Sequence, residues 1–432
     1  MIERLFKLSQ NHSNTGTECL AGATTFLTMA YIVFVNPAML AETGMDKGAV
    51  FVATCLAAAL GSMAMGLIAN YPIALAPGMG LNAYFTYGVV IGMGIPWPVA
   101  LGAVFVSGVL FLILALTKVR EAIINAVPQS LKLAISAGIG LFLGIIAFEN
   151  AGLIEGHRAT LVTLGQLGRP EPLLAAAGFM VMVALESRKI PGAIMIGILG
   201  TAGAGMALGV TPFGGFAALP PSLAPTFLKM DVAGALNLGL VTIVFALLFV
   251  DLFDNAGTLI GLAHRAGMLD GQGRLPRLGR ALIADSLAAM SGGLLGTSTT
   301  TSYIESAAGI NAGGRTGLTA LVTGSLFLAA LFLAPLAASI PAYATAPALL
   351  FVACLMARSL ADIAWDDLTE MVPAVVTALA MPLTFSIAHG ISFGFISFVA
   401  IKSLAGRGRE VGPGAWMLAG AFVLKFVLLG SA

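Results

Sequence analysis

Charged residues are scarce in this sequence of 432 amino acids, where they make up 9% of the chain against 58% for hydrophobic residues. Soluble domains carry about 25% charged residues. The mean hydropathy is +0.98. A chain this poor in charge and rich in apolar side chains needs lipid as the solvent of its outer surface. The composition therefore excludes a water-soluble enzyme and a disordered chain.

Cysteine and histidine are also rare, and the net charge is close to zero. The three cysteines and four histidines are scattered, which argues against a disulfide framework or a metal centre. The net charge is +1 and no polybasic stripe is present, so nucleic acid is not an expected partner. No nucleophile with a neighbouring base is recognisable, so no catalytic residue and no cofactor are expected. The polar N-terminus, residues 1–18, does not have the pattern of a signal peptide.

Successive apolar runs predict an all-α polytopic membrane protein with 14 transmembrane spans. A further apolar stretch at 412–430 is either an interfacial helix or the true last span. The predicted spans are 20–40, 49–69, 73–92, 97–117, 130–149, 172–186, 189–209, 236–262, 280–297, 299–313, 316–338, 345–358, 371–388 and 389–404.

Basic residues predict the orientation. With 14 spans, the loops that hold most Lys and Arg fall on one side of the membrane, and the positive-inside rule makes that side cytoplasmic. The N-terminus is then cytoplasmic, and a cell (inner) membrane is the expected location. His157, Arg158 and Arg169 fall on the outer side, in a longer loop. The residues on the cytoplasmic side are Arg4, Lys7, Lys118, Arg120, Lys132, Arg188, Lys189, Arg265, Arg274, Arg277, Arg280, Lys402, Arg407 and Arg409.

Two predicted spans are unsuited to a plain helix. Residues 71–84 hold two prolines and two glycines at membrane depth, and residues 292–306 are rich in Thr and Ser and include a carboxylate. Each is the third span of a set of seven, so the second set runs inverted relative to the first. Broken helices at matching positions of an inverted repeat point to a transporter site.

Four acids lie within apolar runs: Asp251 and Asp254 in the eighth span, Asp285 in the ninth and Glu305 in the tenth. An acid at the centre of a membrane helix costs roughly 2.5–3.5 kcal/mol on insertion scales, so each is a candidate functional residue. Asp251 and Asp254 share a helix face. Acids shielded from water bind protons readily, so all four are candidates for proton coupling. The alternative roles are a structural hydrogen bond and, for Asp285, a helix cap.

Polar and aromatic residues beside these acids are candidates for binding a solute. Thr300 and Ser302 belong to the Thr-rich run of the tenth span, and exposed backbone and hydroxyl groups at a helix break bind polar solutes. Asn82 and Phe85 offer an amide and a stacking face one helical turn apart, which suits a flat heterocycle. Packing between helices is the alternative for each. Weaker candidates lie in the first span: Phe26, Tyr31, Phe34 and Asn36.

Four stretches resemble one family of transporters. They are TTFLTMAYIVFVNP at 24–37, APGMGLNAYFTY at 76–87, FVDLFDNAGTLI at 249–260 and GTSTTTSYIESAAG at 296–309. They are similar to the bacterial and fungal hypoxanthine, guanine and adenine permeases, the AzgA-like branch of the nucleobase–ascorbate transporter superfamily. The similarity runs from about residue 3 to 410.

The resemblance implies two inverted repeats of seven helices, in which the third and tenth spans each begin with a short β-strand. It implies a core domain of spans 1–4 and 8–11, residues 1–117 and 236–340, and a gate domain of spans 5–7 and 12–14, residues 118–235 and 341–432.

The resemblance also assigns roles to residues. Related carriers place a substrate-binding acid in the eighth span three residues before a glycine, which fits Asp254 better than Asp251. A second acid or amide of the tenth span corresponds to Glu305, and contacts from the third span fall on Asn82 and Phe85. Asn255 departs from the pattern, because a small hydroxyl residue is expected there.

The function implied is secondary active import of purine nucleobases by proton symport, with the core domain moving against the gate. The expected partners are the nucleobase, the bilayer and a second copy through the gate domain, since related carriers are often dimers. A uracil or xanthine carrier is one alternative, against which the Thr-rich motif argues. An anion transporter on the same fold is another, although it would prefer a site without acids.

Overall fold

The computed structural model describes residues 2–117, 128–157, 160–236, 241–268 and 275–429, apart from some side chains of the helix at 241–265 and of the last helix. Within these ranges nine helices are long and apolar enough to cross a membrane, and four shorter apolar helices accompany them. The chain is thus a helical polytopic membrane protein, as its composition predicts. The count of 14 spans and the inverted repeat remain predictions.

The first part of the chain contains α1 (Ile2–Phe6), η1 (Ser9–Asn11), α2 (Thr15–Met29), α3 (Ile32–Ala41), α4 (Lys47–Ala64), η2 (Met65–Ala69), β1 (Leu75–Pro77), α5 (Met79–Ala83), η3 (Tyr84–Gly92), α6 (Trp97–Leu116), α8 (Gln129–Asn150), β2 (Ile154–His157), β3 (Leu161–Leu164), α9 (Pro170–Ser187), α10 (Ala193–Ala207) and α11 (Val232–Ala235). The second part contains α12 (Val241–Arg265), α13 (Leu278–Leu295), β4 (Thr300–Ser302), α14 (Ser306–Asn311), α15 (Gly317–Ala330), η5 (Leu331–Leu333), α16 (Ala334–Ala338), α17 (Ala342–Ala357), η6 (Arg358–Asp362), α18 (Leu368–Leu383), α19 (Ile387–Leu404), η7 (Gly408–Glu410) and α20 (Pro413–Leu429).

Two short strands, β1 and β4, pair antiparallel inside the molecule, with Ala76 opposite Thr301. They occupy the third and tenth predicted spans, where short strands are expected. Prolines in the first segment and β-branched threonines in the second disfavour helix there. Because an unpaired backbone is costly away from water, each strand supplies the other's hydrogen-bond partners. Two further backbone bonds extend the pairing, from Gly78 N to Thr299 O at 2.9 Å and from Tyr303 N to Ala74 O at 3.0 Å.

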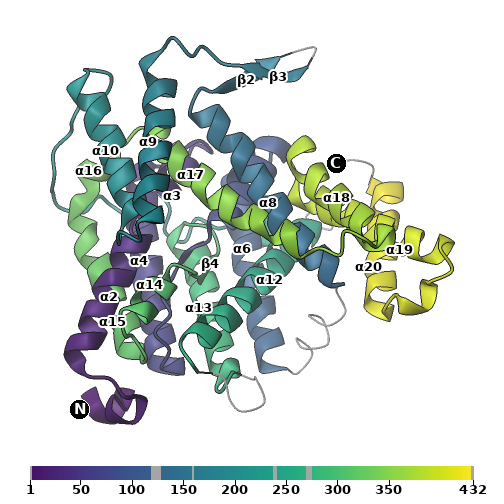
Figure 1. Cartoon of the computed structure of the whole chain (residues 1–432), viewed down its shortest axis with the longest axis horizontal. Helices are drawn as coiled ribbons and strands as arrows, with labels where there is room; N and C mark the ends of the chain where they lie inside the picture. Colours follow the sequence, from purple (N-terminus) through teal and green to yellow (C-terminus); the bar gives the residue numbers. More distant parts are fainter. Residues whose placement is uncertain (1, 118–127, 158–159, 237–240, 269–274, 430–432) are drawn as a thin grey trace.

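The helices around the strands form one packed group. α4 packs on β1, α13 and α12 pack on β4, and α15 packs on both α2 and α4. Figure 1 shows β4 surrounded by α12, α13 and α14. Glycine permits the close contact between the start of η2 and the start of α15, because a Cβ at Gly317 would lie 2.0 Å from the carbonyl oxygen of Gly66.

A buried carboxylate joins the first helix of this group to α15. Glu18 lies in the first turn of α2 and is fully buried. Its oxygens accept the backbone N–H groups of Arg315 at 3.0 Å and of Thr316 and Thr319 at 3.3 Å. Thr319 lies in the first turn of α15, Thr316 is the N-cap of that helix and Arg315 precedes the cap. N–H groups at the start of a helix have no partner within the helix, so Glu18 satisfies groups that the helix itself cannot. From the sequence, Glu18 is expected only as the last residue of the polar N-terminus, and nothing in the local sequence indicates this contact.

The other helices pack mainly on each other. α8 packs along α17 and α18, α9 packs on α10 and α17, and α19 packs between α18 and α20. Figure 1 shows α18, α19 and α20 on the side of the molecule opposite α2 and α15. The predicted boundary between these two spans, at 388/389, falls inside α19, because α18 ends at Leu383 and α19 begins at Ile387. The Ser386 hydroxyl, which accepts the N–H of His389, caps α19.

An ionic cluster joins the ends of α18 and α19 to η7. Lys402 Nζ lies 2.7 Å from Glu370 and 2.8 Å from Glu410, and Arg407 lies 2.7 Å from Asp367 and from Glu410. The hydrogen bonds from Thr369 and Arg407 lower the pKa of Asp367 to about 2. Those from Arg407 and Lys402 lower the pKa of Glu410 to about 2.

Candidate functional site

Asn82 is fixed by a residue two positions before β4. It lies in α5, directly after the crossing of the strands, and is fully buried. The Ser298 hydroxyl donates to its Oδ1. Its Nδ2 has no hydrogen-bond partner in the described part of the chain. The amide therefore presents a donor, and a polar solute with an acceptor would satisfy it.

Glu305 is held by the first predicted span. The Tyr31 hydroxyl donates to Glu305 Oε1 at 2.7 Å, and the Thr28 hydroxyl donates to the backbone oxygen of Glu305 at 3.3 Å. Tyr31 can reach Glu305 because it lies in the short interruption between α2 and α3. The Glu305 side chain is half-buried, and the neighbouring Ile304 is 56% exposed. Glu305 thus has a fixed position at the edge of an open region.

Thr300 and Ser302 lie in β4, and both are buried. The Ser302 hydroxyl donates to Asp285 Oδ1 at 3.3 Å, which places Asp285 behind the strand on α13. Asp285 does not start its helix: α13 begins seven residues earlier, at Leu278, so the helix-cap alternative is wrong. Asp285 and Ser302 form a pair distinct from the pair of Glu305 and Tyr31.

Phe85 lies three residues after Asn82, where the α-helix of α5 gives way to the wider π-helix η3. Its side chain is 1% exposed, within the largest cluster of buried hydrophobic residues. In this conformation the ring of Phe85 contacts other protein side chains and not solvent.

The acids of the eighth span lie on α12, which packs against β4, α14 and α5. Asp251 is buried, at 1% exposure. Asp254 belongs to α12, but its side chain lies outside the described residues. Asn255 is fully buried on the same helix.

Tyr31 and Asn36 are only weak candidates from the sequence, and Ser298 is not among the predicted site residues. In the structure the Asn36 amide donates to Thr54 at 2.7 Å and to Thr297 at 2.8 Å, so that it holds the segment that leads into β4. The spacing of residues along the sequence does not predict any of these hydrogen-bonded pairs. The distance along the chain between Tyr31 and Glu305 is 274 residues.

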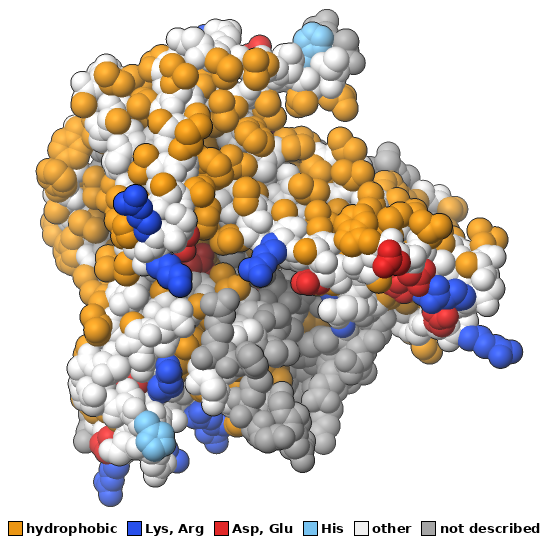
Figure 2. All heavy atoms as spheres, in the orientation of Figure 1, with side chains coloured by type: hydrophobic (Ala, Val, Ile, Leu, Met, Phe, Trp, Pro, Cys, Tyr) orange, Lys and Arg blue, Asp and Glu red, His pale blue; other side chains and the backbone are white. Residues whose placement is uncertain are grey.

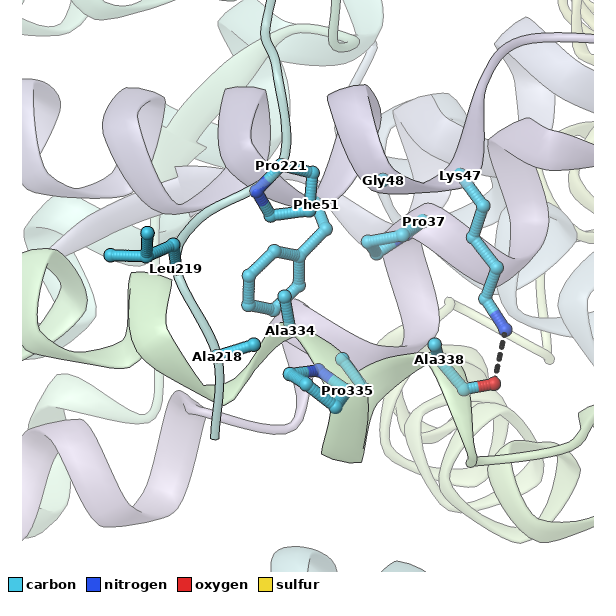
Figure 3. A pocket seen from close by; sticks show the side chains of 11 residues that line it. Pro37, Lys47, Gly48, Phe51, Ala218, Leu219, Pro221, Ala334, Pro335 and Ala338 are labelled. Carbon is cyan, nitrogen blue, oxygen red and sulfur yellow. Dashed lines mark hydrogen bonds between the residues drawn. The ribbon is translucent and has the colours of Figure 1, made fainter. Parts of the chain in front are cut away.

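The cavity in Figure 3 lies elsewhere, between the ends of α3, α4 and α16 and the segment at 218–221. It measures about 270 Å³ and is lined by Pro37, Phe51, Leu219 and other apolar residues, with Lys47 as its one charged lining residue. Lys47 Nζ donates to the Ala338 carbonyl at 3.4 Å. This lining has no carboxylate or amide for a ring N–H, so the cavity is a poor match for the predicted site. Within the described part of the chain, no three His, Cys, Asp or Glu side chains gather as metal ligands.

Two interrupted segments that pair as antiparallel strands, with a buried amide and carboxylates around them, are the arrangement of a secondary transporter. The chain belongs to the Permease family, whose model matches residues 16–428. This confirms the resemblance carried by the four motifs. The chain is a membrane permease and not an enzyme.

Individual relatives match over almost their whole length. The chain is 48% identical to the adenine permease AdeP of Escherichia coli over 429 residues, which are 99% of this chain and 96% of AdeP. It is 45% identical to the guanine/hypoxanthine permease PbuG of Bacillus subtilis over 440 residues, which are 99% of this chain and 100% of PbuG. The transmembrane domain of a cyanobacterial bicarbonate transporter, BicA, has the same fold: the TM-score is 0.64 at 18% identity, covering 88% of this chain and 96% of that one.

Proposed function

We propose that this chain imports purine nucleobases, with adenine, guanine and hypoxanthine as the substrate class. The pairing of Glu305 with Tyr31, beside the paired strands β1 and β4, carries the proposal. The relatives named as adenine and guanine/hypoxanthine permeases support the same substrate class.

The polar groups around the strands suit a purine, which presents ring N–H donors and nitrogen or oxygen acceptors in one plane. Glu305 accepts a ring N–H, and Asn82 Nδ2 donates to an acceptor. A hydrogen bond to a charged group contributes about 1.5–3 kcal/mol net. In this proposal Phe85 stacks on the base, and Thr300, Ser302 and Asp254 complete the site.

The acids favour a purine over an anion. BicA shares the fold, but its low identity says nothing about this site. An anion bound beside Glu305 would be repelled, since like charges close together destabilise each other. A uracil or xanthine carrier stays as the alternative, and competition by these bases distinguishes it.

Proton symport is the proposed coupling, with Asp254 or Glu305 as the proton carrier and Asp251 and Asp285 as further candidates. In this mechanism the carrier acid is protonated facing out, accepts the base and loses its proton facing in. The core domain, residues 1–117 and 236–340, then moves as a body against the gate domain, residues 118–235 and 341–432. We further propose that the chain lies in the inner membrane with its N-terminus in the cytoplasm. In this proposal two copies of the chain form a homodimer through their gate domains.

Uptake of radiolabelled purines into cells without their own purine permeases tests the substrate class. Adenine, guanine and hypoxanthine should compete with one another, and xanthine and uracil should not. Glu305→Ala should weaken binding roughly 10-fold or more, because it removes a charged acceptor worth about 1.5–3 kcal/mol. Glu149→Ala, an exposed acid at the end of α8, is the matched control. Normal purine binding by Glu305→Ala at normal membrane abundance would refute the site.

The coupling ion is tested separately. Uptake should fall as external pH rises, collapse with a protonophore and continue when choline replaces sodium. Asp254→Asn should lose accumulation against a gradient yet retain exchange of internal for external purine. Sodium dependence would refute proton symport. Full accumulation by both Asp254→Asn and Glu305→Gln would remove these acids from the proton path.

A further inference from the structure

The hairpin of β2 and β3 lies between the end of α8 and the start of α9, both of which are long and apolar enough to cross a membrane. It therefore lies where these helices leave the bilayer. Its base is tightly fixed: Gly165 N donates to Leu153 O at 2.9 Å, and a Cβ at Gly165 would lie 2.2 Å from the carbonyl oxygen of Gly152. The hairpin is thus held at a defined level relative to α8 and α9.

The strand register gives the hairpin one apolar face. Ile154 pairs with Leu164, and Gly156 pairs with Val162. Paired residues lie on the same face of an antiparallel sheet, and alternate residues of a strand share that face. Glu155 with its partner Thr163, and His157 with its partner Leu161, occupy the opposite face, which is therefore polar except for Leu161 near the turn.

The apolar face is not covered by the rest of the chain. Val162 is 48% exposed and Leu164 is 66% exposed. Figure 2 shows hydrophobic side chains along the edge of the hairpin nearer the helices, and charged and histidine side chains along the edge away from them. The hydrophobic edge is continuous with the hydrophobic surface of the helices below it, which is the surface that lipid covers in a membrane protein.

We propose that this hairpin is a lipid-contacting anchor, in which Val162 and Leu164 enter the boundary layer of the bilayer. Its apolar face takes the acyl chains and glycerol region of lipid, while Glu155 and Thr163 face water, as in interfacial segments with one apolar side. The anchor holds the ends of α8 and α9 at a fixed depth. The proposal is independent of the substrate and of the coupling ion.

The experiment uses single cysteines on the two faces of the hairpin. The native Cys19, Cys55 and Cys354 are first replaced by serine or alanine, and cysteine is then placed at Val162 or Leu164, with Thr163 and Glu155 as matched controls on the opposite face. Each variant is labelled with an environment-sensitive fluorophore and reconstituted in phospholipid vesicles. Quenching is measured with nitroxide-labelled lipid and with aqueous iodide.

Labels at Val162 and Leu164 should have blue-shifted emission, lose fluorescence with nitroxide-labelled lipid and resist iodide, whereas labels at Thr163 and Glu155 should show the reverse. Equal iodide quenching at all four positions would overturn the proposal. Shielding that disappears when vesicles are diluted to one chain each, or cross-linking between copies through Val162, would also overturn it, in favour of a second copy as the partner. Because all four positions are on the surface, the substitutions do not threaten folding.

Discussion

The hydrogen bond between Ser298 and Asn82 predicts how base preference can be changed. The Ser298 hydroxyl donates to Asn82 Oδ1, which fixes the orientation of the amide so that Nδ2 is the atom left to donate to a substrate. A donor at this point matches the carbonyl oxygen of hypoxanthine and guanine better than the amino group of adenine. Ser298→Ala releases the amide, which can then turn and present Oδ1 as an acceptor. We expect the preference to shift toward adenine.

The size of the shift follows from one hydrogen bond gained or lost. A neutral hydrogen bond contributes about 0.5–1.5 kcal/mol net, which is a factor of roughly 2–10 in relative affinity. The assay measures the concentrations of unlabelled adenine and hypoxanthine that halve the uptake of a labelled purine, and takes their ratio. Ser298→Thr keeps a hydroxyl and should retain the parental ratio. An unchanged ratio in Ser298→Ala, at normal abundance in the membrane, would refute the reasoning, as would an equal loss for both bases.

Three further predictions address stability and orientation. Glu18→Ala leaves three backbone N–H groups at and just before the start of α15 without their acceptor. It should therefore lower the free energy of unfolding in detergent by about 2–3 kcal/mol, more than Glu3→Ala at the exposed N-terminus; equal melting of the two variants would contradict this. The pKa values of Asp367 and Glu410 are lowered to about 2, against 3.8 and 4.5 in the unfolded chain. The ionic cluster therefore stabilises the protein fully above about pH 4.5, and this stabilisation is lost as the pH falls through about 2. When melting temperature is measured from pH 6 downward, Arg407→Ala should lose less stability with falling pH than the parental chain. Parallel curves of melting temperature against pH for the two proteins would contradict this. A cysteine at Gly271, in the Arg-rich loop and without the other cysteines, should resist an impermeant reagent in intact cells and react in inverted vesicles; labelling from outside would reverse the orientation.

The strands β1 and β4 show how much could be read from local sequence. Pro72 and Pro77 with the nearby glycines, and the run of threonines at 299–301, predict breaks at membrane depth because these residues disfavour helix there. The antiparallel register of Ala76 with Thr301 is not contained in either segment alone. It follows from the packing of both strands among α4, α12 and α13.

The membrane class, the two broken segments and the candidate acids follow from local sequence, because scarce charge, prolines and intramembrane carboxylates have direct energetic costs. Which polar groups meet follows from the packing of the helices. Tyr31 reaches Glu305 through the interruption between α2 and α3, Ser298 orients Asn82, and Ser302 of β4 donates to Asp285 of α13. These pairs depend on side-chain hydrogen bonds between segments far apart in the chain, and such bonds form only where the packed helices bring a donor within about 3 Å of an acceptor.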